Sequence, residues 1–386
     1  MKLKSRLITS ILLSFAITAY AATESSKEKI AEQEFSDIIK RNQCVGLAVV
    51  AVKDGKVVYK NTFGYKDLEN KTPLREDDLF RIASISKSFT ATGIMQLVEQ
   101  KKLSLDDDVS GLLGFKVRNP KYPDTPITLR MLLSHSSSMN DANGYFSLNS
   151  INPDSSSTWH NAWNDYAPGT KYEYCNMGYN SLGTILERVS GERFDKYIVN
   201  NILKPLDIYG GYEVLSLNPE KFVKIYEYNR ADSSFTHSPD AYASRAEEIK
   251  NYKSGYSTPV FSPTGGMKIS PLGLAKIMQM HMNNGSLDGV RIISAESSAL
   301  MQSPIISVGD NRYYGFAIET TDRLLDGHTM IGHTGGAYGV FTSMYWDPEH
   351  RFGFIVMTNG CNARRDNGFM SIFRESVKVL HDIFIN

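Results

Sequence analysis

The chain has 386 residues, enough for one large domain or two closely packed ones with an ample core. It is 41% hydrophobic and 22% charged, as ordinary globular proteins are, which argues against a disordered or fibrous chain. Its 42 Lys and Arg balance 42 Asp and Glu, so a nucleic-acid partner has no electrostatic support.

The first residues predict an export signal. Basic residues at positions 2, 4 and 6 precede an apolar run over 7–17, and Ala19-Tyr20-Ala21 is a small-x-small cleavage site. The run is short for a membrane span, and no second span follows it. We therefore expect residues 1–21 to be a signal peptide and the mature chain to be periplasmic or secreted, with no stable membrane span. An uncleaved N-terminal anchor is the alternative.

The N-terminal third predicts a helix, a hairpin and a second helix. Residues 24–41 have the apolar spacing of an amphipathic helix. Two β-rich runs, Val45 to Val52 and Val57 to Tyr65, flank Asp54-Gly55, a strong hairpin signal. Helical spacing resumes over Ser86 to Gln100.

The loop before that second helix carries a candidate nucleophile. Ser84 lies near the helix start and Lys87 three residues later, so the two side chains share one face. A serine hydroxyl needs a neighbouring base, and a lysine held near a helix N-terminus is disfavoured as a cation and can serve as that base. Ser26 and Lys29 repeat the spacing in a polar stretch, so the pattern alone is weak.

The middle of the chain predicts mostly helices and irregular segments. Glycine and proline break residues 103–130 into short helices and turns. The polar stretch 139–170 is long enough to suggest that it borders a site. The tyrosine-rich stretch 212–260 either lines a cleft or covers the helices. Further helices are expected at Leu129 to Leu133, Tyr179 to Val189 and Pro271 to Met282.

The last third changes to strand periodicity. Strands are predicted at Tyr313 to Glu319, Gly339 to Trp346 and Phe352 to Thr358, before an amphipathic helix at Met370 to Phe384. Strands at both ends of the chain suggest one antiparallel sheet with helices on its faces and a helical lobe inserted in the middle, an α+β fold.

Two further motifs follow Ser84 in order. Tyr174-Cys175-Asn176 precedes a helix, and His333-Thr334-Gly335-Gly336 is expected on a turn into the next strand. They lie 90 residues after Ser84 and 159 residues after Tyr174, respectively. Each motif alone is weak, but the three together in this order are specific.

With these motifs, residues 35–386 resemble the class C β-lactamase, DD-peptidase and serine esterase family of penicillin-recognising serine hydrolases. Other segments that carry the resemblance are Leu132 to Ser137, Asn176 to Gly183, Pro263 to Met267 and the strand-Trp346-Asp347-Pro348-strand pattern.

The resemblance implies a β-lactamase/transpeptidase-like fold with a five-stranded antiparallel sheet flanked by helices. Residues 22–386 would form one catalytic domain, with an α/β lobe from about 22–83 and 262–386 and an all-α lobe from about 84–261. The site would lie in the cleft between the lobes. The first and last strands would be neighbours, which favours a Cys44–Cys361 disulfide, and three buried thiols are the alternative.

The resemblance also implies roles for the motif residues. Ser84 would attack a carbonyl carbon and become acylated, while Lys87 and Tyr174 share the proton transfers. A phenol can do this only if positive charge lowers its pKa, and Lys87 is the available charge. Asn176 would bind a substrate amide and Lys87. The N–H groups of Ser84 and Gly336 would form the oxyanion hole.

His333 departs from the lysine usual in the family's β-lactamases. Histidine supplies less positive charge at neutral pH, which weakens the attraction for a substrate carboxylate. His333-Thr334-Gly335 also resembles the motif of certain secreted DD-carboxypeptidases, D-amino-acid peptidases and esterases of the family. The resemblance therefore implies a DD-carboxypeptidase-like or D-amino-acid-peptidase-like enzyme or an esterase, acting on a small molecule or a peptide. His333, Thr334 and Gly335 would line the substrate site. Arg365 is a weaker candidate for the carboxylate, with a solvated surface position as the alternative.

Other activities remain as alternatives. One is a class C-type β-lactamase, and another is a penicillin-binding sensor that acylates but hardly turns over. Cys175 is expected to be a packing thiol. No cofactor and no metal are expected, because His160, His237, His281 and His328 show no metal-ligand spacing. We expect His135 to brace its helix turn and the mature chain to be a monomer.

Overall fold

A nine-stranded antiparallel sheet forms the centre of the computed structural model, which describes residues 26–386. The predicted signal peptide at 1–21 lies outside the described residues. Across the sheet the strands follow the order β11-β12-β13-β14-β15-β16-β1-β2-β3. Its five long strands are β14 (Met330–Ala337), β15 (Val340–Asp347), β16 (Phe352–Thr358), β1 (Gly46–Lys53) and β2 (Lys56–Asp67).

The expected antiparallel sheet is therefore confirmed, and short strands extend both of its edges. These are β11 (Ile306–Gly309), β12 (Arg312–Tyr314) and β13 (Glu319–Thr321) on one side and β3 (Thr72–Pro73) on the other. The two ends of the chain meet where β1 pairs with β16, with Leu47 opposite Thr358. The hairpin turn is also as predicted. Asp54 and Gly55 have positive φ values of 50° and 76°, which let a two-residue turn match the right-handed twist of the two strands.

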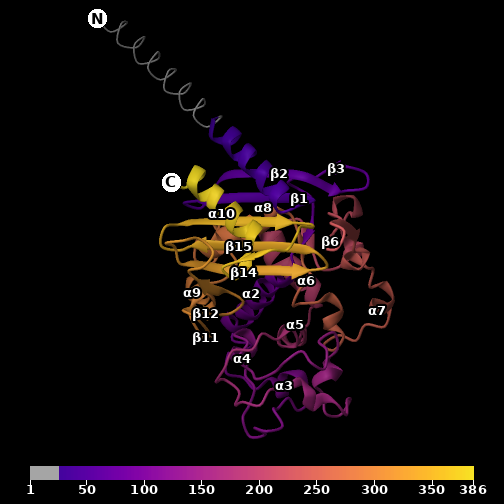
Figure 1. The fold of residues 1–386 in the computed structure, drawn as a ribbon. Coiled ribbons are helices and arrows are strands. Elements are labelled where there is room, and N and C mark those ends of the chain that lie inside the picture. The colour runs from indigo at the N-terminus through magenta and orange to yellow at the C-terminus, as the bar shows by residue number, and fades with distance from the viewer. Residues whose placement is uncertain (1–25) are drawn as a thin grey trace, which may run out of the picture.

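Helices cover both faces of this sheet (Figure 1). The helix over residues 26–41 and α10 (Ser371–Phe384) pack on one face around Phe35, Phe354 and Leu380. On the other face, α8 (Pro271–Met282) contacts β1, β15 and β16 and joins the sheet to the core of the helical part. That part hangs below the sheet in Figure 1 and is built around α2 and α5, which contact each other.

The predicted helices are present with small shifts of their ends. The remaining α-helices are α2 (Ser86–Glu99), α3 (Val109–Leu113), α4 (Leu129–Leu133), α5 (Asn176–Ser190), α6 (Phe194–Ile198), α7 (Ala246–Lys250) and α9 (Ala295–Gln302).

Within residues 26–386, short strands form four further small sheets outside the large one. They are β4 (Phe80–Arg81), β8 (Lys268–Ile269) and β5 (Gly210–Gly211) in one group, then the pairs β6 (Tyr226–Asn229) with β7 (Ser234–His237), β9 (Ser286–Leu287) with β10 (Val290–Arg291), and β17 (Arg365–Asp366) with β18 (Phe369–Met370). The middle segment is therefore mostly helical but also carries the β6–β7 hairpin.

Two strand predictions are wrong in detail. The strand expected over Tyr313 to Glu319 is split into β12 and β13, because the Gly315 N–H donates to the Ile318 carbonyl and Ala317 takes a φ of 61°, which reverses the chain. The His333 motif lies within β14 and not on a turn. The strand was not predicted because the glycines at 332, 335 and 336 have low β-strand propensity.

The three cysteines are free thiols. Although β1 and β16 are neighbours as expected, the Cys44 thiol lies 2.9 Å from the Thr358 hydroxyl and 3.1 Å from the Gly46 carbonyl, and it is not bonded to Cys361. The disulfide is therefore absent, and the alternative of three buried thiols holds for Cys175 and Cys361, whereas Cys44 is partly exposed. Over residues 26–386, no helix combines the length and the apolar character needed to cross a membrane.

Candidate active site

Ser84 lies in a short 3-10 turn, Ala83–Ile85, that runs directly into α2. The Ile82 N–H donates to the Met267 carbonyl at 3.0 Å, and the Ile82 carbonyl accepts from the Thr342 hydroxyl of β15 at 2.9 Å. These bonds hold the turn between the sheet and β8. Ser84 is partly exposed, whereas Lys87 in the first turn of α2 is fully buried. The rival pair, Ser26 and Lys29, lies exposed on the N-terminal helix.

The side-chain nitrogen of Lys87 faces three oxygen atoms. It lies 2.8 Å from Asn176 Oδ1, 3.0 Å from the Thr264 carbonyl and 3.3 Å from Ser84 Oγ. The first two can only accept hydrogen bonds, whereas a hydroxyl can donate. A neutral amine has two N–H groups and one lone pair. The two acceptors match its N–H groups, and its lone pair is left for the Ser84 hydroxyl.

The protonation of Lys87 suits this arrangement. Burial lowers the pKa of Lys87 to about 7, although the negative charge of Asp141 acts in the opposite direction. The Lys87 nitrogen also lies 4.6 Å from the centre of the Tyr174 ring, which favours the cation, but the loss of water outweighs this contact. A large share of Lys87 is therefore neutral at physiological pH, as a general base must be.

Asn176 is held from both sides. Its Oδ1 accepts from Lys87 and, at 2.6 Å, from the Thr264 hydroxyl, while its Nδ2 donates to Asp141 at 2.8 Å. Asp141 also accepts from the backbone N–H groups of Asn176 and Met177 at 2.9 and 3.0 Å, which caps the N-terminus of α5. The donors used by Asp141 fix the orientation of the Asn176 amide, so that its oxygen faces Lys87.

Replacing Asp141 with asparagine is therefore expected to disturb Lys87 through Asn176. The new amide group would present a donor to atoms that now donate to the carboxylate. We expect kcat to fall by about 10²-fold, the size of effect that a small misplacement of a catalytic group can have, and the helix cap to lose about 1 kcal/mol of stability. Steady-state kinetics and thermal denaturation measure the two effects. Asp154, exposed in the same loop, is the matched control, and an equal loss in Asp154→Asn would contradict the assignment.

Tyr174 lies beside the nucleophile, but its pKa is opposite to the expectation. Its hydroxyl is hydrogen-bonded to Ser84, yet burial raises its pKa above the usual value, and the charge of Asp141 adds to this effect. The prediction that Lys87 lowers the pKa of Tyr174 is wrong, because burial leaves Lys87 largely uncharged. Tyr174 therefore remains a protonated phenol that can donate a proton.

His333 is buried and neutral. Its Nδ1 is 2.5 Å from the Thr334 carbonyl, which can only accept, so Nδ1 carries the proton and Nε2 accepts from the Tyr314 hydroxyl at 3.0 Å. Burial lowers the pKa of His333 to about 3, and repulsion from Lys87 acts in the same direction. The ring lies 6.3 Å from that of Tyr174. His333 thus packs beside the proton-transfer residues without positive charge.

His135 belongs to the same aromatic cluster. Its Nδ1 accepts from the Cys175 N–H at 3.1 Å, and its ring lies 4.4 Å from Tyr174 and 5.0 Å from Tyr314. Burial lowers its pKa well below the usual value. The predicted bracing role of His135 therefore extends to the segment that carries Tyr174. The Cys175 thiol is buried with a raised pKa, which agrees with a packing role.

The motif on β14 offers an open strand edge. β14 pairs with β15 along its length but with β13 only over Met330 to Gly332, so within the described chain no strand lies beside the other edge from His333 to Ala337. Gly336 is exposed and Thr334 half-buried on this segment. Apart from the Thr334 carbonyl, which accepts from His333 Nδ1, the backbone N–H and C=O groups that face this edge are available to an extended ligand.

Gly335 allows β14 to approach the Ser84 turn. A Cβ at this position would lie 2.2 Å from the Ile82 carbonyl and 3.1 Å from the Ser84 nitrogen. We expect Gly335→Ala to cost about 1–3 kcal/mol of stability through overpacking and to lower activity by displacing Ser84. At Gly336 the nearest atom to a Cβ would be 3.4 Å away, in Phe341, so Gly336→Ala should melt like the wild type. Thermal denaturation of both variants tests this, and equal melting temperatures would refute the close approach.

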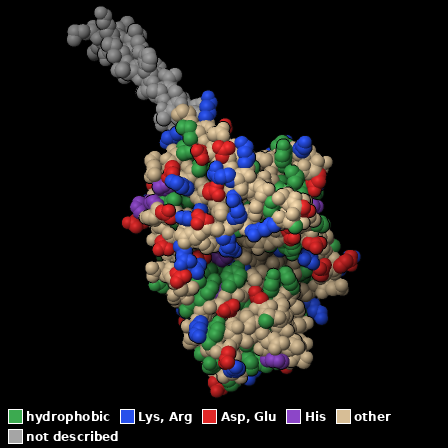
Figure 2. Space-filling model, in the orientation of Figure 1, with side chains coloured by type: hydrophobic (Ala, Val, Ile, Leu, Met, Phe, Trp, Pro, Cys, Tyr) green, Lys and Arg blue, Asp and Glu red, His purple; other side chains and the backbone are tan. Residues whose placement is uncertain are grey.

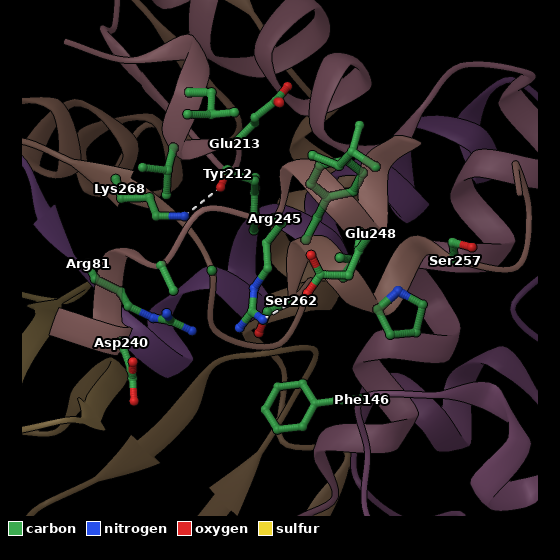
Figure 3. A pocket seen from close by; sticks show the side chains of 18 of the residues that line it. Arg81, Phe146, Tyr212, Glu213, Asp240, Arg245, Glu248, Ser257, Ser262 and Lys268 are labelled. Carbon is green, nitrogen blue, oxygen red and sulfur yellow. Dashed lines mark hydrogen bonds and ion pairs between the residues drawn. The ribbon is translucent and has the colours of Figure 1, made fainter. Parts of the chain in front are cut away.

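A cavity of about 500 Å³ lies next to the Ser84 turn (Figure 3). Arg81, three residues before Ser84, lines it, and its guanidinium stacks 5.0 Å from the ring of Tyr338, which follows β14. Arg245 lines the cavity in an ion pair with Glu248 at 3.1 Å, and Phe146 adds an apolar wall. Lys268 also lines it, but burial lowers the pKa of Lys268 well below its usual value. The cavity is lined by residues of 139–170, which was expected to border a site, and of 212–260, for which lining a cleft was one of two alternatives. Figure 2 also shows hydrophobic side chains gathered on the helical half just below the sheet.

The structure brings together all the candidate residues except one. Arg365 lies exposed on β17, where its guanidinium donates to the Gly368 carbonyl three residues away. Among residues 26–386, no hydrogen bond or ion pair joins it to the Ser84 cluster, and its proposed carboxylate binding stays a prediction. The residues that sequence reasoning missed are Asp141, Tyr314 and the Thr264 carbonyl. The Pro263 to Met267 segment was a signal for Thr264, but its backbone contact with Lys87 has no sequence signature.

Comparison with known proteins agrees with this geometry. The family model described as Beta-lactamase matches residues 31–374. Penicillin-binding protein 4* of Bacillus subtilis (strain 168) is 26% identical over 361 residues, which cover 87% of this chain and 72% of that protein. Protein flp of Staphylococcus aureus (strain NCTC 8325 / PS 47) is 31% identical over 172 residues, and the match spans 44% of this chain but only 34% of flp.

Two solved structures share the fold across nearly the whole chain. An octameric penicillin-binding protein homologue from Pyrococcus abyssi has a TM-score of 0.72 at 26% identity, covering 92% of this chain and 77% of its own. The D-amino acid amidase from Ochrobactrum anthropi SV3, solved with D-phenylalanine, has a TM-score of 0.71 at 21% identity, covering 94% and 99%.

Proposed function

The chain belongs to the Beta-lactamase family of serine hydrolases, and from this premise we propose that it is an exported enzyme that cleaves amide or ester bonds through an acyl-enzyme on Ser84. The proposed activity is that of a DD-carboxypeptidase or D-amino-acid peptidase, or of an esterase. The observation that carries the proposal is the setting of Lys87, with two pure acceptors and the Ser84 hydroxyl around its nitrogen.

The proton transfers follow from this setting. Lys87 takes the Ser84 proton as Oγ forms a bond to the substrate carbonyl carbon, and the backbone N–H groups of Ser84 and Gly336 stabilise the oxyanion. Tyr174, still protonated, donates a proton to the leaving nitrogen or oxygen as its bond to carbon breaks. In deacylation Tyr174, now deprotonated, takes a proton from a water molecule as the water attacks the ester, and Lys87 returns its proton to Ser84 Oγ as the acyl bond breaks.

The neutral His333 supports the choice of substrate class. Without a lysine at this position, the site has less attraction for the carboxylate of a β-lactam and no added positive charge beside Tyr174. The open edge of β14 suits an extended peptide, which would add its backbone hydrogen bonds to the strand. A peptide of the peptidoglycan type, ending in D-amino acids, fits the open edge, and the likeness to a D-amino acid amidase fold adds support. An ester without a carboxylate fits the neutral His333.

A substrate panel tests the proposal on the purified mature protein. The panel is a peptide ending in D-Ala-D-Ala, p-nitrophenyl butyrate and nitrocefin. We expect the peptide or the ester to be turned over faster than nitrocefin. Preferred hydrolysis of nitrocefin would overturn the substrate assignment in favour of a β-lactamase. A fluorescent penicillin that labels Ser84 and then persists without turnover would instead indicate a sensor.

A further inference from the structure

A cluster of two histidines and one aspartate lies at the end of the sheet opposite the candidate active site. His328 precedes β14, Asp347 ends β15, and His350 lies in the turn between β15 and β16. Gly336 lies eight residues from His328 along the chain, six of them within β14 from Met330, or about 20 Å of strand. In Figure 1 these ends of the strands lie beside α10, and Figure 2 shows histidine side chains at the corresponding edge.

The three side chains converge on one point. Nδ1 of His328 and Nδ1 of His350 each lie 2.8 Å from the same oxygen, Asp347 Oδ2. One potential ligand atom from each residue lies within 4.8 Å of the other two. This convergence is built from segments 19 residues apart in the chain, and for that reason the spacing of histidines in the sequence did not indicate it.

The carboxylate is held in place by the backbone. Asp347 Oδ1 accepts from the N–H groups of Glu349 and His350, both at 2.9 Å, which leaves Oδ2 for the imidazoles. The Asp347 side chain is 2% exposed, whereas those of His328 and His350 are 18% and 52% exposed. A fixed, buried oxygen ligand thus sits behind two nitrogen ligands that solvent can reach. His381 of α10 packs against the His328 ring at 4.9 Å and limits its movement.

From this geometry we propose that His328, Asp347 and His350 form a zinc-binding site that is separate from the active site. Two imidazole nitrogens and one carboxylate oxygen are ligands that Zn²⁺ accepts, whereas Mg²⁺ and Ca²⁺ prefer oxygen ligands alone. On binding, each neutral imidazole carries its proton on Nε2, so that the Nδ1 lone pair faces the ion. A water molecule completes the coordination on the exposed side.

The site has a structural consequence. The ion would connect the loop before β14 to the β15–β16 turn, which in the sheet lie side by side but far apart in sequence. Because only the folded chain brings the three ligands together, bound Zn²⁺ stabilises the fold, and the melting temperature rises with its concentration.

Calorimetric titration of the chelator-treated mature protein with Zn²⁺ tests the proposal. We expect one equivalent to bind and the melting temperature to rise by a few degrees, and Co²⁺ to give the visible absorption of a four-coordinate site. His350→Gln, at a half-exposed position, should weaken binding at least about tenfold, and His328→Gln should do the same. His160→Ala, at an exposed histidine outside the cluster, should bind as the wild type does.

Two results would overturn the proposal. The first is a wild-type protein that binds no Zn²⁺, and the second is a His350→Gln protein that binds Zn²⁺ as tightly as the wild type. Neither result affects the proposed hydrolase, because Ser84 and Lys87 take no part in the cluster.

Discussion

Replacing Ser84 with alanine is expected to remove hydrolysis of every substrate while the fold stays intact. Loss of a catalytic serine costs on the order of 10⁴- to 10⁶-fold in kcat. Ser84 is partly exposed in a turn that backbone hydrogen bonds of Ile82 hold in place, so the missing hydroxyl leaves no buried cavity. The measurement is turnover of the best substrate in the panel, together with the melting temperature.

A matched control exists within the chain. Ser26 stands three residues before Lys29 just as Ser84 stands before Lys87, but on the exposed N-terminal helix. Ser26→Ala should keep full activity and full labelling by a fluorescent penicillin, whereas Ser84→Ala should lose both. A Ser84→Ala protein that still turns over substrate would refute the assignment of the nucleophile.

Replacing Lys87 with methionine is expected to lower the acylation rate by about 10²- to 10⁴-fold, the usual contribution of a general base. Methionine has a similar length and is apolar, so it fills the buried space but cannot accept the Ser84 proton. Lys29→Met, on the exposed helix, serves as the control. Single-turnover kinetics with a chromogenic ester isolates acylation from the later steps.

The pH dependence identifies the base. Because burial lowers the pKa of Lys87 to about 7, its neutral, active form is gained as the pH rises through about 7. Acylation by the wild type should therefore fall about tenfold per pH unit below 7 and level off above it. His333 cannot produce this inflection, since burial lowers its pKa to about 3. A wild-type rate that is flat across neutral pH, or a Lys87→Met enzyme with the same inflection, would exclude Lys87 as the base.

Local patterns were sufficient for much of the fold. The Asp54-Gly55 hairpin, the helix after Ser84 and the helix from Pro271 to Met282 depend on turn chemistry and apolar periodicity over a few residues. The strand that carries His333 escaped the same reasoning. Its three glycines have low strand propensity, and two of them, Gly332 and Gly335, lie so close to neighbouring backbone that a Cβ would clash.

The candidate site also has features that the sequence predicts and features that only the folded chain shows. The order of Ser84, Tyr174 and His333 along the chain was enough to identify the candidate nucleophile. Helical spacing alone places Lys87 beside Ser84. The choice of proton acceptor was not accessible in this way. Burial and partners from distant segments set a pKa, and Asp141, Asn176 and the Thr264 carbonyl reach Lys87 only in the folded chain.

The sequence by itself therefore determined the family, its general class of serine hydrolase and the candidate nucleophile, since these depend on residue types at short or ordered spacings. Only the tertiary structure decided that Lys87 is the group poised near neutrality, that Tyr174 stays protonated, and that His328, Asp347 and His350 meet. Each of these results depends on which groups surround a side chain and how far water is excluded. Those conditions arise from contacts between segments that the chain order keeps apart.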